Sequence, residues 1–72
     1  MGEIRRVDYK KIERLRLDMG LNKQSFCRKA RTCEFTYNRL PESRKTRDDV
    51  IINLARALEI KPSEIVYWES DS

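Results

Sequence analysis

The sequence predicts an all-α fold of five short helices in a single domain that spans residues 1–72. Apolar residues recur three, four and seven positions apart, which is the spacing of one helix face. Glycine and proline number only two each, too few for a β-rich chain with many tight turns. Charged residues make up 39 % of the chain, but the regular apolar spacing favours a folded domain over disorder. The expected helices cover residues 8–19, 23–30, 34–40, 48–58 and 62–68.

The first helix is predicted from its apolar stripe and from a suitable residue at each end. Ile12, Leu15 and Met19 fall on one face of an amphipathic helix. Asp8 is well suited to cap its N-terminus, because a carboxylate oxygen accepts hydrogen bonds from the free N–H groups there. Gly20 follows the last apolar residue, where a helix end favours a residue that tolerates positive φ. The helix should therefore end at Met19.

A polar break separates the second and third helices. Asn22 is expected to cap the second helix. The third should begin after Cys33, with Glu34 placed where the helix carries a partial positive charge. Pro41 should stop it, because proline lacks an N–H and pushes the preceding residue out of the α region. The third helix is therefore expected to be short, about two turns.

Capping signals and apolar spacing also predict the last two helices. Thr46 precedes Asp49 by three residues, which resembles a capping box with Asp in place of Glu. Pro62 suits the first position of a fifth helix. The apolar residues of the fourth helix are Val50, Ile51, Leu54, Ala55 and Leu58.

Charge is divided unevenly along the chain. Residues 1–47 hold 14 Lys/Arg and 6 Asp/Glu, a net charge of +8, whereas residues 48–72 hold 2 and 6, a net charge of −4. Such asymmetry on a short chain indicates a basic face directed at a polyanion. The alternative is that these charges only keep a helical surface soluble.

Composition argues against several classes of function. The two cysteines, Cys27 and Cys33, are too few for a zinc site, and the chain has no histidine. We expect two thiols, no metal and no cofactor. Catalysis is not expected either, because nothing near the thiols could serve as a base. The N-terminus has no apolar signal region, and no run of eighteen apolar residues occurs, so a cytoplasmic location with no membrane contact is expected.

Two segments together resemble the lambda repressor and Cro helix-turn-helix family, also called the Xre family. They are "RLDMGLNKQSFCRKA" and, after a break and a short helix, "LARALEIKPSEIV". The similarity covers roughly residues 9–66 and implies a compact lambda-repressor-like domain. In the family a small residue occupies the position of Cys27, at the contact between two helices. The matching residues are Arg16, Gly20, Leu21, Phe26, Leu54, Ala55, Ala57, Leu58, Ile60 and Ile65.

The resemblance implies a transcriptional regulator of bacterial, phage or mobile-element origin that binds double-stranded DNA. Its third helix would enter the major groove while its second lies across the phosphate backbone. The expected base-contact residues are Glu34, Phe35, Thr36, Asn38 and Arg39. The expected phosphate-contact residues are Lys23, Arg28, Arg44, Lys45 and Arg47. Arginine can bind guanine and asparagine can bind adenine through paired hydrogen bonds.

Three residues depart from the family pattern near the expected reading helix. Arg31 replaces the turn glycine, where a left-handed conformation would cost roughly 1 kcal/mol. Tyr37 replaces a buried aliphatic residue, so the core must accommodate it or its hydroxyl must reach water. Pro41 replaces a glutamate that pairs with the equivalent of Arg16, and Glu42 is the expected substitute partner.

Relatives usually bind DNA as dimers, and a homodimer is expected here. Val66, Tyr67 and Trp68 form a dense apolar cluster suited to a dimer interface. Alternatively, Trp68 folds back to cap a small core. The rival to DNA binding is a protein-binding module, such as an antitoxin or co-regulator, that retains the scaffold but does not read DNA alone.

Overall fold

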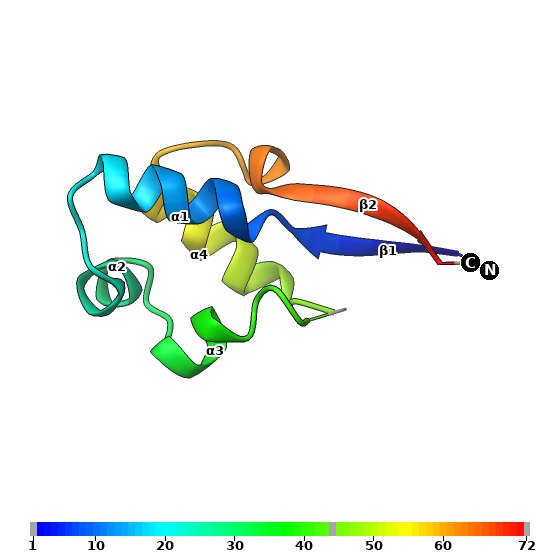
Figure 1. Ribbon diagram of the computed structural model, residues 1–72, viewed down its shortest axis with the longest axis horizontal. Coiled ribbons are helices and arrows are strands. Elements are labelled where there is room, and N and C mark those ends of the chain that lie inside the picture. The colour runs from blue at the N-terminus through cyan, green and yellow to red at the C-terminus, as the bar shows by residue number, and fades with distance from the viewer. Residues whose placement is uncertain (1, 44, 72) are drawn as a thin grey trace.

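The computed structural model describes residues 2–43 and 45–71 and has a helical body with a two-stranded ribbon at one end (Figure 1). Gly2 and Asp71, the first and last described residues, pair at the far tip of the ribbon, and the molecule measures 39 × 21 × 18 Å. The described elements, in chain order, are β1 (Gly2–Val7), α1 (Tyr9–Asp18), α2 (Lys23–Lys29), α3 (Glu34–Asn38), α4 (Asp48–Leu58), the 3₁₀ turn η1 (Pro62–Ile65) and β2 (Val66–Asp71).

The structure is a mixed α/β fold, so the prediction of an all-α, five-helix domain is wrong. The expected fifth helix, 62–68, is replaced by η1, after which the chain continues as β2. The physical reason is the composition of β2, because Val66, Tyr67 and Trp68 are β-branched or aromatic and favour a strand when a partner strand is available. Residues 2–7, to which the sequence assigned no element, supply that partner.

The two strands pair antiparallel along their whole length. Val7 lies opposite Val66, Arg5 opposite Trp68 and Glu3 opposite Ser70. The ribbon is tied to the body where the strands enter it, because the Asp8 N–H donates to the Ile65 carbonyl at 2.7 Å.

Over the described residues, four α-helices form the body and begin at or one residue after the predicted positions. α1 and α4 lie along the body, α2 lies at the end opposite the ribbon, and α3 lies along one side of the body below α4 (Figure 1). The side chains that meet in the centre come from α1, α2, α3, α4 and η1. The most deeply buried are Ile12, Phe26, Tyr37, Leu54 and Ile65, each with no exposed surface.

Two of the predicted caps and one turn are confirmed. Asp8 accepts from the Lys11 N–H at 3.2 Å, and Asn22 accepts from the Ser25 N–H at 2.8 Å. Gly20 has a φ of 72°, the conformation for which a glycine was expected.

The capping box predicted at Thr46 is wrong. The N-cap of α4 is Arg47, and its side chain makes no capping hydrogen bond. Asp49 instead accepts from the adjacent Val50 N–H at 2.9 Å. Thr46 lies one residue too early to cap the helix and is nearly buried, and its hydroxyl has no hydrogen-bond partner among the described residues.

Candidate nucleic-acid interface

A tight turn joins α2 to α3 and sets the angle at which α3 leaves the body. Arg31 adopts the left-handed conformation with a φ of 55°, which the sequence identified as costly for a non-glycine residue. The Thr32 N–H then donates to the Cys27 carbonyl at 2.9 Å, which ends α2. Cys33 caps α3, with its sulfur accepting from the Thr36 N–H at 3.5 Å. Arg31 therefore adopts the left-handed conformation that a glycine would favour at this turn.

Tyr37 anchors α3 to the body. Its ring packs edge-on against Phe26 of α2 at 5.7 Å and lies 5.4 Å from Tyr9 of α1. Its hydroxyl donates to the Glu13 carboxylate at 2.5 Å. The core accommodates the tyrosine because α1 supplies an acceptor for its hydroxyl.

Glu13 also takes the role expected of Glu42, so the predicted pairing of Arg16 with Glu42 is wrong. The Arg16 guanidinium donates to the Glu13 carboxylate at 2.7 Å and to the Leu21 carbonyl at 2.7 Å. Glu13 lies one helical turn from Arg16 on α1, whereas Glu42 is exposed in the loop that follows α3.

This network changes the pKa values of two of its members. Burial, followed by the hydrogen bond to Glu13, raises the pKa of Tyr37. Burial alone would raise the pKa of Glu13, but hydrogen bonds from Arg16 and Tyr37 outweigh it and hold that pKa below its usual value. Near neutral pH the phenol is therefore protonated and the carboxylate charged, which is the pairing that fixes α3 on α1.

The outward side of α3 is exposed and polar apart from one aromatic ring. Phe35 is 69 % exposed, and the Arg39 guanidinium lies over its ring at 5.3 Å. Asn38 accepts from the Lys23 ammonium at 3.3 Å. The cation–π contact limits the orientations of Arg39 without using its N–H donors. Glu34 is exposed at the helix start, and Thr36 is half-buried.

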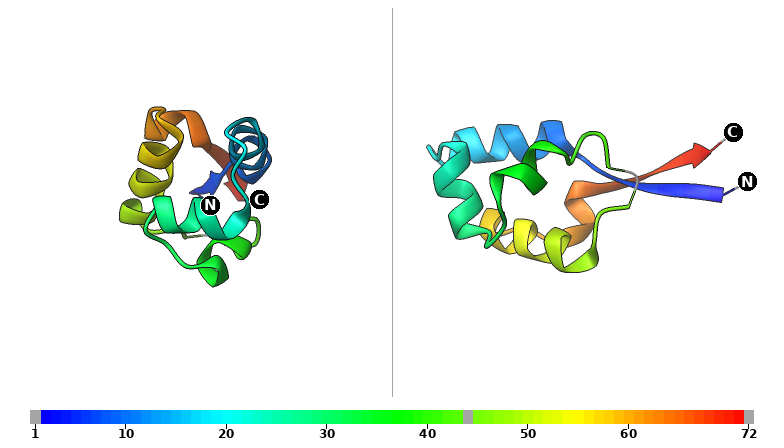
Figure 2. Two further views of the ribbon diagram at one scale, coloured as in Figure 1. Left: turned by 90° about the vertical axis from the view of Figure 1, so that its left-hand side faces the viewer. Right: turned by 90° about the horizontal axis from the view of Figure 1, so that it is seen from below.

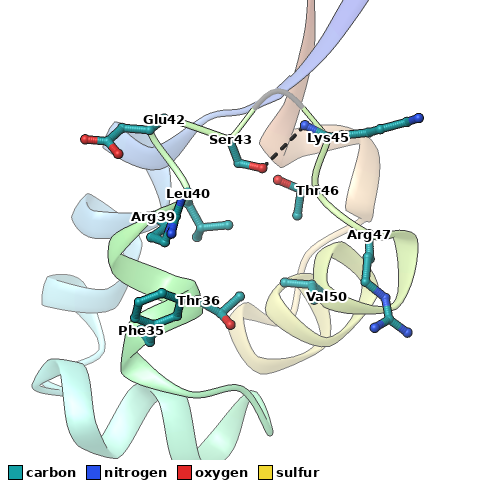
Figure 3. Close-up of a pocket in the computed structure, with 10 residues that line it drawn as sticks. All are labelled: Phe35, Thr36, Arg39, Leu40, Glu42, Ser43, Lys45, Thr46, Arg47 and Val50. Carbon is teal, nitrogen blue, oxygen red and sulfur yellow. Dashed lines mark hydrogen bonds between the residues drawn. The ribbon is translucent and has the colours of Figure 1, made fainter.

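A groove of about 340 Å³ runs between α3 and the start of α4 (Figure 3). Phe35 and Thr36 form its α3 side, and Val50 lies on α4 across from them. The side chains of Lys45 and Arg47 extend from the loop on the side away from α3. Cations thus border the groove at Arg39, Lys45 and Arg47, while Glu42 adds one negative charge.

Two arginines of the ribbon hold the loop that forms this groove, and the sequence did not single them out. Arg5 donates to the Thr46 carbonyl at 2.7 Å and pairs with Asp48 at 2.6 Å. Arg6 donates to the Ser43 carbonyl at 3.4 Å and pairs with Glu69 at 3.1 Å. These two positive charges are therefore used within the fold.

The predicted site residues fall into three groups. Those that line the groove are Phe35, Thr36, Arg39, Lys45 and Arg47. Asn38 and Lys23 touch each other beside it, and Glu34 and Arg28 are exposed on α3 and α2 without lining it. Arg44, a predicted phosphate contact, lies outside the described residues. The groove also includes residues that the sequence did not suggest, namely Leu40, Glu42, Ser43, Thr46 and Val50.

All the described candidates belong to α2, α3 and the loop that leads into α4. Seen from below, α3 lies in front, between α1 and α4 (Figure 2). The helix is therefore accessible along its outer side to a large ligand.

The two thiols differ in accessibility and acidity. Cys27 is buried, and burial raises its pKa. Cys33 is exposed, and hydrogen bonds from the Thr36 hydroxyl and then the Thr36 N–H lower its pKa. Over residues 2–43 and 45–71, no three cysteine or acidic side chains converge as a metal site would require. In the same part of the chain, no helix has the length and apolar character needed to cross a bilayer.

No protein-family model, no curated protein and no solved structure matches the chain.

Proposed function

We propose that the protein is a sequence-specific regulator that binds double-stranded DNA and reads the major groove with α3. The observation that carries this proposal is the two-sided character of α3. Its inward residue, Tyr37, is fixed on α1 and α2, while Phe35, Asn38 and Arg39 remain exposed on its outer side. A helix held in this way is a rigid element of the right diameter for the major groove of B-DNA.

The chemistry of the exposed residues supports base reading. Arg39 can donate two hydrogen bonds to guanine, and its contact with Phe35 reduces the conformational entropy lost on binding. Asn38 must release Lys23 before it can pair with adenine, because that pairing uses both its oxygen and its nitrogen. The released ammonium is then free to contact a phosphate.

The surrounding charge supports phosphate binding. Lys23, Lys45 and Arg47 flank α3 on two sides, as expected for a duplex that passes over the helix. Arg47 pairs with Asp49 at 3.3 Å, but both side chains are largely exposed, so a phosphate can compete for Arg47 at little cost. A regulator of this kind would act in the cytoplasm as a homodimer on two half-sites.

Selection of bound sequences from a random duplex library tests this function. We expect a recovered motif with dyad symmetry. Arg39→Ala should lose a preference for one G·C pair, with affinity for the parent motif reduced by about 5- to 150-fold. Arg14→Ala is the matched control, because it removes the same charge from an exposed position on α1 and should keep the motif.

The salt dependence of binding separates phosphate contacts from base contacts. Lys45→Ala should reduce the slope of log affinity against log salt by about 0.9 for duplex DNA and leave the motif unchanged. If no motif is recovered and binding to duplex DNA is not steeply salt-dependent, a protein-binding module replaces the proposed function. A motif that does not depend on Arg39 would retain the function but reject this residue as a reader.

A further inference from the structure

The ribbon projects from the body as two strands, and its aromatic residues remain in solvent. Trp68 is 61 % exposed and Tyr67 is 47 % exposed. An isolated two-stranded ribbon is only marginally stable in water unless another surface covers it. Arg5 and Arg6, which lie opposite Trp68 and Tyr67, are held by the loop before α4, whereas the two aromatic side chains of β2 remain exposed and are the part that needs a cover.

The strand register determines which residues share a face of the ribbon. Residues directly opposite each other in an antiparallel pair point to the same face, and neighbours along a strand point to opposite faces. Trp68 therefore lies on the face of Arg5 and Val66, while Tyr67 lies on the other face with Arg6. The two aromatic side chains cannot contact the same flat partner.

A hollow of about 260 Å³ lies on the Trp68 face, where the ribbon meets α4 and η1. Its lining is largely apolar. Ile52 is 43 % exposed, whereas its neighbour Ile51 is buried. The lining residues are Arg5, Asp48, Ile51, Ile52, Pro62, Ser63 and Val66. We refer to this site as the ribbon hollow.

Trp68 does not fill the ribbon hollow of its own chain. It lies two residues beyond Val66 on an extended strand, a displacement of roughly 7 Å along the ribbon. It lines a separate depression with Glu3, Ile4, Arg5 and Lys45. The face thus carries a projecting indole and, next to it, an apolar hollow.

We propose that two copies of the chain dock through this face about a two-fold axis, with Trp68 of each copy in the ribbon hollow of the other. A two-fold interface requires one patch to contain both complementary parts, and this face contains a projection and a recess side by side. This inference deepens, and for the existence of a dimer rests on, the proposed function, but its evidence is the ribbon with the adjoining surface of α4 and η1, not the α3 surface.

Charge favours a second copy over a strongly charged partner. Arg5 and Asp48 at the border of the ribbon hollow neutralise each other in an ion pair at 2.6 Å. Glu3 and Lys45, beside Trp68, carry opposite charges. A patch with balanced charge does not repel its own copy, whereas the α3 surface with its excess of cations would.

The size of the patch sets the strength expected of the dimer. An indole offers at most roughly 250 Å² of surface, so Trp68 at 61 % exposure contributes roughly 150 Å². A standard stable interface buries about 800 Å² per partner. Each partner contributes one such indole with Ile52 beside the hollow, which falls short of that value, so the dimer should form at micromolar or higher concentration.

Trp68 is the only tryptophan in the sequence, so its fluorescence reports directly on this contact. The emission of the free protein should shift to shorter wavelength as concentration rises from about 1 μM to about 1 mM. Sedimentation over the same range should show the change from monomer to dimer. No DNA is present, so the result is independent of the test of DNA reading.

Two variants separate this face from the rest of the ribbon. Ile52→Arg places a charge in the ribbon hollow and should abolish both the shift and the dimer without altering the tryptophan. Tyr67→Ser is the matched control, because it removes an aromatic from the opposite face of the same strand and should retain both. Far-UV circular dichroism should show that each variant is folded.

Mixing two defective chains tests whether the contact is reciprocal. Trp68→Ala lacks the projection, and Ile52→Arg lacks the hollow. When Trp68→Ala is titrated to millimolar concentration into Ile52→Arg, the single remaining tryptophan should shift to shorter wavelength, because one of the two contacts is restored. Addition of more Ile52→Arg should leave the emission unchanged.

The proposal is overturned if the emission of the parent protein does not depend on concentration. This face would then bind a different partner or remain exposed to solvent. The proposal is also overturned if Ile52→Arg dimerises like the parent, or if Tyr67→Ser is the variant that dissociates. Absence of a shift in the mixture would reject the reciprocal geometry.

Discussion

The helical body and the terminal ribbon are stabilised by different means. In the body, apolar side chains from every helix meet in one core, and its central residues have no exposed surface. In the ribbon, Val7 is the only buried residue among 3–7 and 66–70, and side chains beyond it contact the loop or solvent. Local sequence determines where the helices form, whereas the ribbon depends on pairing between the two ends of the chain. Predictions of stability should therefore differ sharply between the two regions.

The largest expected difference is between Phe26 and Tyr67. Phe26→Ala should lower the free energy of unfolding by about 3–5 kcal/mol, because it removes a fully buried ring that supports Tyr37. Tyr67→Ala should change it by only about 0.5 kcal/mol, since the ring is on the surface. Urea denaturation at low protein concentration measures both. Equal losses would show that the ribbon and the body are one cooperative core.

A smaller effect is expected where α2 packs against the rest of the body. Cys27→Leu should lower the free energy of unfolding by about 1–3 kcal/mol, because the larger side chain overfills a buried site. Cys33→Ala on the exposed side of the turn should cost less, since sulfur is a weak cap. Thermal melts compare the two variants. A melt of Cys27→Leu unchanged from the parent would mean that α2 can move away from its neighbours.

The contact between Tyr37 and Glu13 should make the body sensitive to alkali. The folded protein holds the phenolic proton of Tyr37 more tightly than the unfolded chain, whose pKa is near 10. Stability from this contact is present below that value and falls as pH rises above it, by about 1 kcal/mol at pH 11. Tyr37→Phe should show a shallower alkaline loss in urea denaturation. Tyr9, whose pKa burial also raises, accounts for a residual loss.

If Tyr37→Phe loses as much free energy of unfolding at alkaline pH as the parent does, a group other than Tyr37 causes the loss. The helical body would then not owe its pH dependence to the attachment of α3.

The helices could be predicted from sequence because each is defined within about a dozen residues. The apolar spacing of α4 and the caps at Asp8 and Asn22 are local features. The ribbon could not be predicted in this way, because β1 and β2 are separated by nearly the whole chain. One local signal was available, the β-branched and aromatic run at Val66–Trp68, but Pro62 favoured a helix start and the run was assigned to that helix.

The candidate site shows the same limit. The exposed residues of α3 could be placed because a short helix between Cys33 and Pro41 fixes which positions face outward. The other side of the groove depends on the loop before α4, which Arg5 and Arg6 hold from the far end of the sequence. The net charge of residues 1–47 includes Arg5 and Arg6, so the sequence predicted that both were available to bind a polyanion. Their ion pairs with Asp48 and Glu69 show that some of the positive charge stabilises the fold.

The smallest effect concerns the two non-glycine residues with positive φ, Arg31 in the turn before α3 and Glu59 after α4. Glycine relieves the strain at either position, so Arg31→Gly and Glu59→Gly should each raise the free energy of unfolding by about 1 kcal/mol. Both changes lie in the body and act on the backbone alone, so urea denaturation should give similar gains. Binding to the selected duplex distinguishes them. If the turn only positions α3, Arg31→Gly should retain the motif, as Glu59→Gly does. Loss of affinity in Arg31→Gly alone would mean that the guanidinium contacts DNA, which would explain why the chain tolerates a strained arginine where glycine would fit.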